Sequence, residues 1–268
     1  MKKLLPILIF FISVSYPVFA AISGQINHDD VNYKNKIIDS RTKKPVSGAK
    51  ISIPEIGFET YSDNDGAFKL NADVSDKTVM FVERDGYKVF SLTVDNSVFN
   101  SPLKLGIEQS SPFDMQITSG VIHLGDNMYS DNSANSSDFR LSANGHYLAN
   151  IFKRPQATQK QDIVIRIGTL IGLDTKKAKQ MGQNRIARVY SAPSEVFVNG
   201  HKIAKLELNG DDVEIVIPKN IFKEENELVI KCGRNLFQTA YIDYDDIEIA
   251  NLRIEVKDIY GFARHRWF

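Results

Sequence analysis

Three ordered turn signals, each set between stretches of alternating polar and apolar residues, constrain the fold of residues 36–94. At 44–45 a Lys-Pro pair forms a turn in which proline fixes φ and ends the preceding strand. The stretch 49–53 then places every second, apolar side chain on one face of a strand. Residues 63–66 combine short polar side chains with a glycine that accepts positive φ, and a third turn follows at 85–88. The region therefore predicts antiparallel β-strands joined by tight turns.

This pattern resembles the carboxypeptidase regulatory-like domain, a small prealbumin-like β-sandwich. The family run D-x-x-T-x-x-P-[VI]-x-G-A-x-[IV] is present from Asp39 onward, and the run [DN]-x-[DN]-G-x-F ends at Phe68. The match departs from the family at Asn35, where members often carry the glycine that opens the first strand. The resemblance covers residues 35–105 and implies a seven-stranded sandwich. The family is a non-catalytic folding, spacing or interaction module, so its name gives no ground to expect peptidase activity.

The N-terminal residues 1–20 predict a secretory signal peptide. A basic start and an apolar run, 4–19, precede small residues that suit cleavage after Ala20. A membrane anchor is the alternative, and it is disfavoured because the run is short and contains two prolines. We expect export to the periplasm, the cell surface or the medium, with a polar lead-in at 21–34 and no transmembrane segment after signal removal.

A second β-rich region is predicted at 113–258, after a linker at 106–112. Only 174–181 has the pattern of a helix, with Asp174 as a fair N-cap and Gly182 as a fair stop. Many alternating strands with one inserted helix predict a larger jelly-roll sandwich, so the expected fold class is all-β. The strand signals lie at 113–117, 120–124, 139–141, 162–168, 186–190, 195–198, 205–208, 213–217, 227–231 and 247–256.

Residues 186–232 resemble the galactose-binding-like jelly roll of many carbohydrate-active enzymes and lectins. The resemblance rests on a Val-Phe-Val-Asn-Gly hairpin at 196–200 and on the run Glu-Asn-Glu-Leu-Val-Ile at 225–230, with 246–256 as the closing strand. Asn-Gly is the strongest short hairpin signal. These residues are structural in the family, so the resemblance implies the fold and carries no ligand specificity.

Sugar-binding sandwiches stack an exposed aromatic side chain on a sugar ring and hydrogen-bond its hydroxyls through planar polar groups. We predict that the segment 234–241, between two late strands, binds the ligand in this way. For each aromatic residue, burial in the core is the competing interpretation. The candidate residues are Arg234, Asn235, Gln238 and Tyr241, with Tyr147, Asn144, Tyr244 and Trp267 as further platforms or polar partners.

The loop 125–138 is dense in oxygen donors, and calcium takes about six to eight oxygen ligands from such groups. Its spacing is not that of an EF-hand. The competing interpretation is a solvated loop whose short polar side chains cap turns. A structural calcium ion would be held by Asp126, Asp131, Asn135 and Asp138.

No motif predicts catalysis. The histidines lack metal-site spacing, and His123 and His201 are expected at the surface or rim. No serine lies in a G-x-S-x-G elbow. The single Cys232 sits in an alternating strand and is expected to be a buried thiol. The paired carboxylates at 211–212, 224–225 and 245–246 are expected in solvated turns.

The sequence therefore predicts an exported, non-catalytic binding protein whose jelly roll binds carbohydrate on a cell surface or polymer, with the first sandwich as a spacer or interaction module. The alternative is an envelope scaffold or adhesion component that binds protein and no glycan, and a hydrolase on the second sandwich is a third hypothesis. Basic and acidic residues are equal at 33 each, which gives no bulk attraction to nucleic acid. The basic, aromatic tail at 259–268 either contacts an anionic surface or docks on the sandwich.

Three structural observations separate these hypotheses. An exposed aromatic beside Asn or Arg in a concave site favours carbohydrate binding. An apolar patch at a sheet edge favours a protein partner. Two carboxylates that face each other across a cleft favour a hydrolase.

Overall fold

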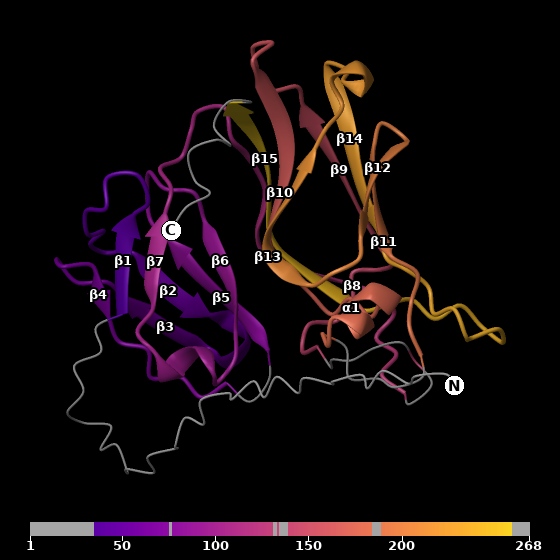
Figure 1. The fold of residues 1–268 in the computed structure, drawn as a ribbon, viewed down its shortest axis with the longest axis horizontal. Coiled ribbons are helices and arrows are strands. Elements are labelled where there is room, and N and C mark those ends of the chain that lie inside the picture. Colours follow the sequence, from indigo (N-terminus) through magenta and orange to yellow (C-terminus); the bar gives the residue numbers. More distant parts are fainter. Residues whose placement is uncertain (1–34, 75–76, 131–132, 134–138, 184–188, 259–268) are drawn as a thin grey trace, which may run out of the picture. The chain divides into compact units, whose positions relative to one another are not determined.

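The computed structural model describes residues 35–74, 77–130, 133, 139–183 and 189–258. These residues belong to one compact unit, Lys34–Phe268, and fold into two β-sandwiches (Figure 1). The secondary structure is almost entirely β, which confirms the predicted all-β class. In the part of the chain so described, no helix is long and apolar enough to cross a membrane. The predicted signal peptide, lead-in and C-terminal tail lie outside the described residues.

The first sandwich has the predicted seven strands, in sheets of order β4-β1-β7 and β3-β2-β5-β6. β1 runs parallel to β7 and antiparallel to β4. A buried apolar cluster that includes Ile37, Ile51 and Met80 forms its core. The elements are β1 (Asn35–Asp39), β2 (Lys50–Ile53), the 3-10 turn η1 (Pro54–Ile56), β3 (Phe58–Tyr61), β4 (Ala67–Phe68), β5 (Thr78–Glu83), β6 (Phe90–Val94), η2 (Val98–Asn100) and β7 (Lys104–Ile107).

Two residues of the sequence pattern fix the turns of this sandwich. The Asp39 carboxylate accepts hydrogen bonds from the backbone N–H groups of Thr42 (2.7 Å) and Arg41 (3.0 Å). These bonds, chiefly the one from Thr42, lower the pKa of Asp39 to about 2. Gly66 has a φ of 70°, and a Cβ at this position would overlap the carbonyl oxygen of Ile37. Glycine is therefore required where the pattern places it.

The second sandwich has eight strands in two sheets, β13-β10-β15-β8 and β12-β11-β14-β9. Its pairing is nested, because β8 pairs with β15, β9 with β14, β10 with β13 and β11 with β12. A chain folded back on itself and rolled in this way is a jelly roll, as predicted. The elements are β8 (Met115–Leu124), β9 (Tyr147–Lys153), β10 (Gln161–Ile171), α1 (Lys176–Gln180), β11 (Ser194–Val198), β12 (His201–Leu206), β13 (Gly210–Val216), η3 (Lys219–Ile221), β14 (Glu225–Lys231) and β15 (Ile247–Asp258).

Several predicted boundaries differ from the structure. One strand, β8, replaces the two predicted at 113–117 and 120–124, and residues 139–141 form no strand. The N-cap of α1 is Thr175, whose hydroxyl accepts the N–H of Ala178 (3.0 Å), whereas the predicted cap Asp174 is buried. β9 has no counterpart in the predicted set. The predicted strand at 186–190 lies mostly outside the described residues.

The two sandwiches pack on each other through strands that are buried on both faces. β5 is buried from Thr78 to Val82, β10 from Ile163 to Ile171, and β15 from Ile247 to Glu255. A small apolar cluster joins Val79 and Phe81 of the first sandwich to Ile171 and Ala250 of the jelly roll. β7 extends through Ile107, into the segment predicted as a linker. Burial on two faces explains why these strands have nearly continuous apolar runs instead of strict alternation.

Candidate functional site

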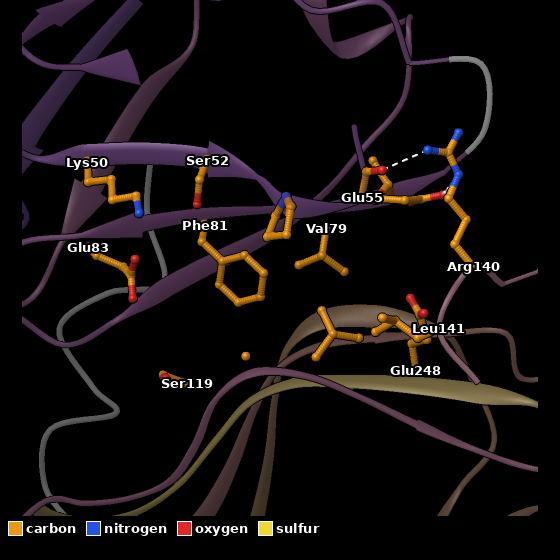
Figure 2. Close-up of a pocket in the computed structure, with 14 residues that line it drawn as sticks. Lys50, Ser52, Glu55, Val79, Phe81, Glu83, Ser119, Arg140, Leu141 and Glu248 are labelled. Atoms are coloured by element: carbon orange, nitrogen blue, oxygen red, sulfur yellow. Dashed lines mark hydrogen bonds and ion pairs between the residues drawn. The ribbon is translucent and has the colours of Figure 1, made fainter. Parts of the chain in front are cut away.

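A cleft of about 430 Å³ lies where the first sandwich faces the jelly roll (Figure 2). One wall comes from β2, β5 and the turn η1, and the other comes from β8, β15 and the segment at 140–141. Clefts of this size at the junction of two folded units are typical of small-ligand sites. We therefore treat this cleft as the candidate functional site.

An apolar surface forms the inner part of the cleft. Val79 and Phe81 point into it from β5, and Figure 2 shows the Phe81 ring directed toward the opposite wall. Val121 of β8 and Leu141 contribute from the jelly roll. Side chains alternate along a strand, so Val79 and Phe81 face the cleft while Met80 faces the core of the first sandwich.

Charged groups stand at both ends of the cleft. At one end, the Arg140 guanidinium pairs with the Glu55 carboxylate (3.2 Å) and donates to the Glu55 carbonyl oxygen (2.7 Å). Lys50 and Glu83 lie at the other end (Figure 2). Lys50 also pairs with Glu59 (2.8 Å). The rim thus offers both donors and acceptors without a large excess of either charge.

Glu248 places a buried carboxyl in the jelly-roll wall of the cleft. Glu248 is 7% exposed, and it lies opposite His123 in the pairing of β15 with β8. Burial raises the pKa of Glu248 to about 7, Glu55 adds to this rise, and His123 opposes it. Glu248 is therefore more readily protonated near neutral pH than an ordinary carboxyl, and a protonated carboxyl can both donate and accept hydrogen bonds.

His123 ties the loop at 140–141 to the core of the jelly roll. Its Nδ1 lies 2.5 Å from the Leu141 carbonyl oxygen, and its Nε2 lies 2.7 Å from Oδ1 of Asp246. Burial alone would lower the pKa of His123, but the hydrogen bonds to Asp246 and Leu141 raise it. His123 is 1% exposed and Asp246 is fully buried, so the predictions of a surface histidine and of a solvated carboxylate pair at 245–246 are wrong.

A polar contact, which we call the β6 seam, holds the two walls together beside the cleft. It joins residues 88–93 to β10, β13 and β15. The Val89 carbonyl oxygen accepts from Nδ2 of Asn251 (2.7 Å) and from Nη1 of Arg253 (3.2 Å). Asp211, predicted in a solvated turn, is exposed but lies in β13, where it accepts both the N–H and the hydroxyl of Thr93 (2.9 Å each).

Glu255 is the common acceptor of the β6 seam. Its carboxylate pairs with Lys88 of the first sandwich (3.2 Å), and with Arg253 (2.5 Å) and Arg166 (3.5 Å) of the jelly roll. Burial alone would raise the pKa of Glu255, but Arg253, together with Lys88 and Arg166, lowers it to about 2. The seam therefore depends on an ionised carboxylate that both sandwiches share.

The predicted ligand residues lie in a loop between β14 and β15, residues 234–244, which we call the late loop. Asn235 is 7% exposed, donates to Oδ2 of Asp243 (2.6 Å) and accepts the N–H groups of Phe237 and Gln238. Gln238 accepts the N–H of Ala240 (3.0 Å). Two of the four predicted residues thus bond to the loop itself.

The other two predicted residues are on the surface. Arg234 is exposed, and its guanidinium lies 5.6 Å from the centre of the Tyr244 ring. Tyr244 in turn stacks on His146 at 4.4 Å. Tyr241 is 44% exposed, and Tyr147 is 51% exposed on β9. None of the four predicted residues lines the cleft described above.

The predicted calcium ligands are described only in part. Asp126 accepts the N–H groups of Met128 (3.1 Å) and Tyr244 (2.8 Å), and burial raises its pKa. Asp131, Asn135, Asp138 and also Trp267 lie outside the described residues. Within the described ranges, no group of three or more His, Cys, Asp or Glu side chains is arranged to hold a metal ion. The calcium site stays a prediction.

Sequence reasoning did not identify the cleft residues. The available signal was charge inside nearly continuous apolar runs, because Glu248 stands between Ile247 and Ile249. Such a residue on a strand buried at both faces must have a partner or line a cavity. The sequence reasoning did predict that Cys232 is a buried thiol. Its burial raises its pKa.

One comparison with known proteins concerns the first sandwich. Residues 34–114 match the family model of the CarboxypepD_reg-like domain, and domains of this family are regulatory and non-catalytic. The match ends before β8, so the galactose-binding-like resemblance of the jelly roll stays a prediction. No curated protein matches the chain. The first sandwich is therefore assigned to the carboxypeptidase regulatory-like family.

Proposed function

We propose that this protein is an exported, non-catalytic binding protein and that a carbohydrate binds in the cleft between the two sandwiches. The observation that carries the proposal is the make-up of this cleft, where an apolar inner surface around Val79 and Phe81 is ringed by hydroxyl, carboxyl and cationic groups. A sugar ring has apolar C–H faces and hydroxyls that donate and accept hydrogen bonds. Sites of this kind place few polar groups around an apolar lining.

The charges around the cleft support an uncharged, polar ligand. Lys50 and Arg140 offset Glu55 and Glu83, and all four line the cleft. Glu248 adds a carboxyl whose raised pKa leaves it partly protonated at neutral pH. A strongly charged ligand would meet no excess of the opposite charge here.

A hydrolase would use the same cleft differently. Glu55 and Glu248 stand on opposite walls (Figure 2), and glycoside hydrolysis needs two carboxyl groups, one of them with a raised pKa. However, the Glu55 carboxylate is held in an ion pair with Arg140. This pairing supports a binding role, since a partnered carboxylate is a poorer nucleophile or base.

A protein partner is the alternative function, and one observation favours it. β9 is an edge strand of its sheet, and Tyr147, Ala149 and Ile151 form an exposed apolar strip along one face of it. Tyr147 and Ile151 are 51% and 57% exposed. Exposed edge strands can accept an extended segment of another protein. An envelope scaffold or adhesion component would use this strip.

A glycan array probed with the protein lacking residues 1–20, followed by calorimetry on the glycans that bind, tests the proposal. Arg140→Ala and Glu83→Gln alter the cleft, whereas Arg234→Ala and Tyr241→Ala alter the late loop. Loss of one directional polar contact costs about 1–3 kcal/mol, which is roughly a five- to 150-fold loss of affinity. We expect this loss for the cleft variants and unchanged affinity for the late-loop variants.

Each other outcome has a defined meaning. If only the late-loop variants lose affinity, the sugar binds where the sequence placed it and the cleft assignment is wrong. Release of free sugar during the calorimetry would establish a hydrolase. If no glycan binds at millimolar concentration, the protein-binding alternative replaces the proposal.

A further inference from the structure

The late loop has a rigid stem. At its base, Arg234 and Tyr244 form a β-bridge and stack through the guanidinium and the ring. One step further out, the N–H of Asn235 donates to the carbonyl oxygen of Asp243 (2.8 Å), and the two side chains bond as well. Ser133 donates to the same Asp243 carboxylate (2.9 Å). The two limbs are thus held at a fixed separation.

Four large apolar side chains are exposed beyond this stem, two on each limb. Leu236 and Ile242 follow the Asn235–Asp243 pair and are 58% and 56% exposed, while Phe237 and Tyr241 are 53% and 44% exposed. The intervening residues, 238–240, carry no charge. Figure 1 shows this gold-coloured loop projecting away from the jelly-roll strands. An apolar group of this size on a projecting loop marks an interaction site.

Basic residues lie beside the apolar tip. Tyr190 contacts Phe237 edge to face at 4.9 Å between ring centres, and the Lys179 ammonium of α1 lies 5.8 Å from the Tyr190 ring centre. The same helix exposes Lys176 and also Lys177, which pairs with Glu207 (3.3 Å). The acidic residues at the base of the loop, Asp243, Asp245 and Asp246, are buried. Cationic side chains of α1 and the apolar side chains of the tip are thus connected through Tyr190.

We propose that the late loop docks on an anionic lipid bilayer. In this arrangement Leu236 and Phe237 enter the boundary between headgroups and acyl chains, while Lys176 and Arg234 meet the anionic headgroups. The tip is convex. A protein partner would need a matching pocket to bury it, whereas a bilayer deforms around it. This proposal concerns a surface separate from the cleft and holds whether or not the cleft binds sugar.

Vesicle flotation tests the proposal. The protein lacking residues 1–20 is mixed with vesicles of phosphatidylcholine alone or of equal parts phosphatidylcholine and phosphatidylglycerol. We expect binding to the anionic vesicles that weakens as salt is added. Leu236→Ser and Phe237→Ser should each reduce partitioning by roughly tenfold, the loss expected when one large apolar side chain no longer inserts. Lys176→Gln should reduce partitioning by roughly fivefold.

The control is Ile151→Ser with Tyr147→Ser, which removes comparable exposed apolar area from β9. The control variant should float with anionic vesicles as the unaltered protein does. The proposal is overturned if the unaltered protein does not float, or if the control loses binding as strongly as the late-loop variants. Capture of a protein through Phe237 without any vesicle binding would also overturn it, in favour of a protein partner. Circular dichroism confirms that each variant is folded.

Discussion

The contact between the two sandwiches has two halves of opposite character. Along the β6 seam, Glu255 is shared by cations from both sandwiches, and the Val89 carbonyl oxygen accepts from two jelly-roll side chains. At the cleft, the ion pair between Glu55 and Arg140 links the walls beside the small apolar cluster of Val79, Phe81, Ile171 and Ala250, and the Arg140 side chain is 61% exposed. The seam joins the sandwiches through buried polar contacts, and the cleft side leaves space between them. A cleft can stay open at a junction only when another part of that junction fixes its walls.

The two halves also shift the pKa of a buried carboxyl group in opposite directions. Glu255 is surrounded by cations that keep its pKa near 2. Glu248 faces the cleft, and burial raises its pKa to about 7. Both belong to β15, so one strand provides a charged residue that fixes the seam and a carboxyl of raised pKa that faces the cleft. The substitutions below test whether this division is correct.

Glu255→Gln should give the largest effect. It leaves Arg253, Arg166 and Lys88 without their shared carboxylate, and breaking a buried ion pair costs about 3–5 kcal/mol of unfolding free energy. The lowered pKa means that this stability is present above the ordinary value of 4.5 and is lost as the pH falls through about 2. Urea unfolding measures the loss. The exposed Glu227→Gln should change stability by less than about 0.5 kcal/mol, and an equal loss there would contradict the assignment.

Glu248→Gln should remove a contribution to stability whose dependence on pH is opposite in sense to that of Glu255. The folded-state pKa of about 7 lies above the ordinary 4.5, so the carboxyl destabilises the fold progressively as pH rises between these values. Glutamine stays neutral throughout. Relative to the unaltered protein, the variant should gain about 3 kcal/mol on going from about pH 4 to about pH 8. Parallel stability curves for the two proteins would show that Glu248 is not held in a site of raised pKa.

Gly168→Ala should disturb the seam, whereas Gly120→Ala should not disturb the cleft. A Cβ on Gly168 would lie 2.6 Å from Nδ2 of Asn251 and against the Ser91 hydroxyl, while nothing lies within 4 Å of a Cβ on Gly120. Overpacking a tight contact costs about 1–3 kcal/mol. Thermal unfolding of both variants measures the difference. Equal stability of the two variants would mean that the seam accommodates an added methyl group as readily as the cleft does.

Arg140→Ala should have the smallest effect on stability. The Arg140 side chain is 61% exposed and the Glu55 side chain is 27% exposed, and ion pairs open to solvent contribute about 0–1 kcal/mol. Denaturant unfolding at low and high salt should therefore give nearly the same free energy for the variant and the unaltered protein. A loss comparable to that of Glu255→Gln would mean that the cleft end also fixes the sandwiches, and the contrast between the two halves would fail.

The sequence predicts elements whose signals are local and fails where distant residues decide the outcome. Asp39 and Gly66 act within their own turns, so the first sandwich could be assigned from the pattern. The Asn-Gly turn at 199–200 likewise predicted the β11–β12 hairpin. β9 was missed because the alternation of polar and apolar residues along it is weak, and its strand conformation depends on pairing with the distant β14. His123 and Asp246 are 123 positions apart, and their bond depends on the pairing of β8 with β15.

The nested pairing of the jelly roll also has a consequence for the order of folding. The first sandwich closes within residues 35–107, whereas β8 must wait for β15, more than a hundred residues later. Such distant pairings are slow to form. In a chain in which β10 and β15 have not yet docked, Val79 and Phe81 on the outer face of β5 would lack their native partners Ile171 and Ala250, and exposed apolar surface of this kind favours aggregation. Because β15 also carries Glu248, Arg253 and Glu255, the cleft and its support are completed together, by the last strand of the chain.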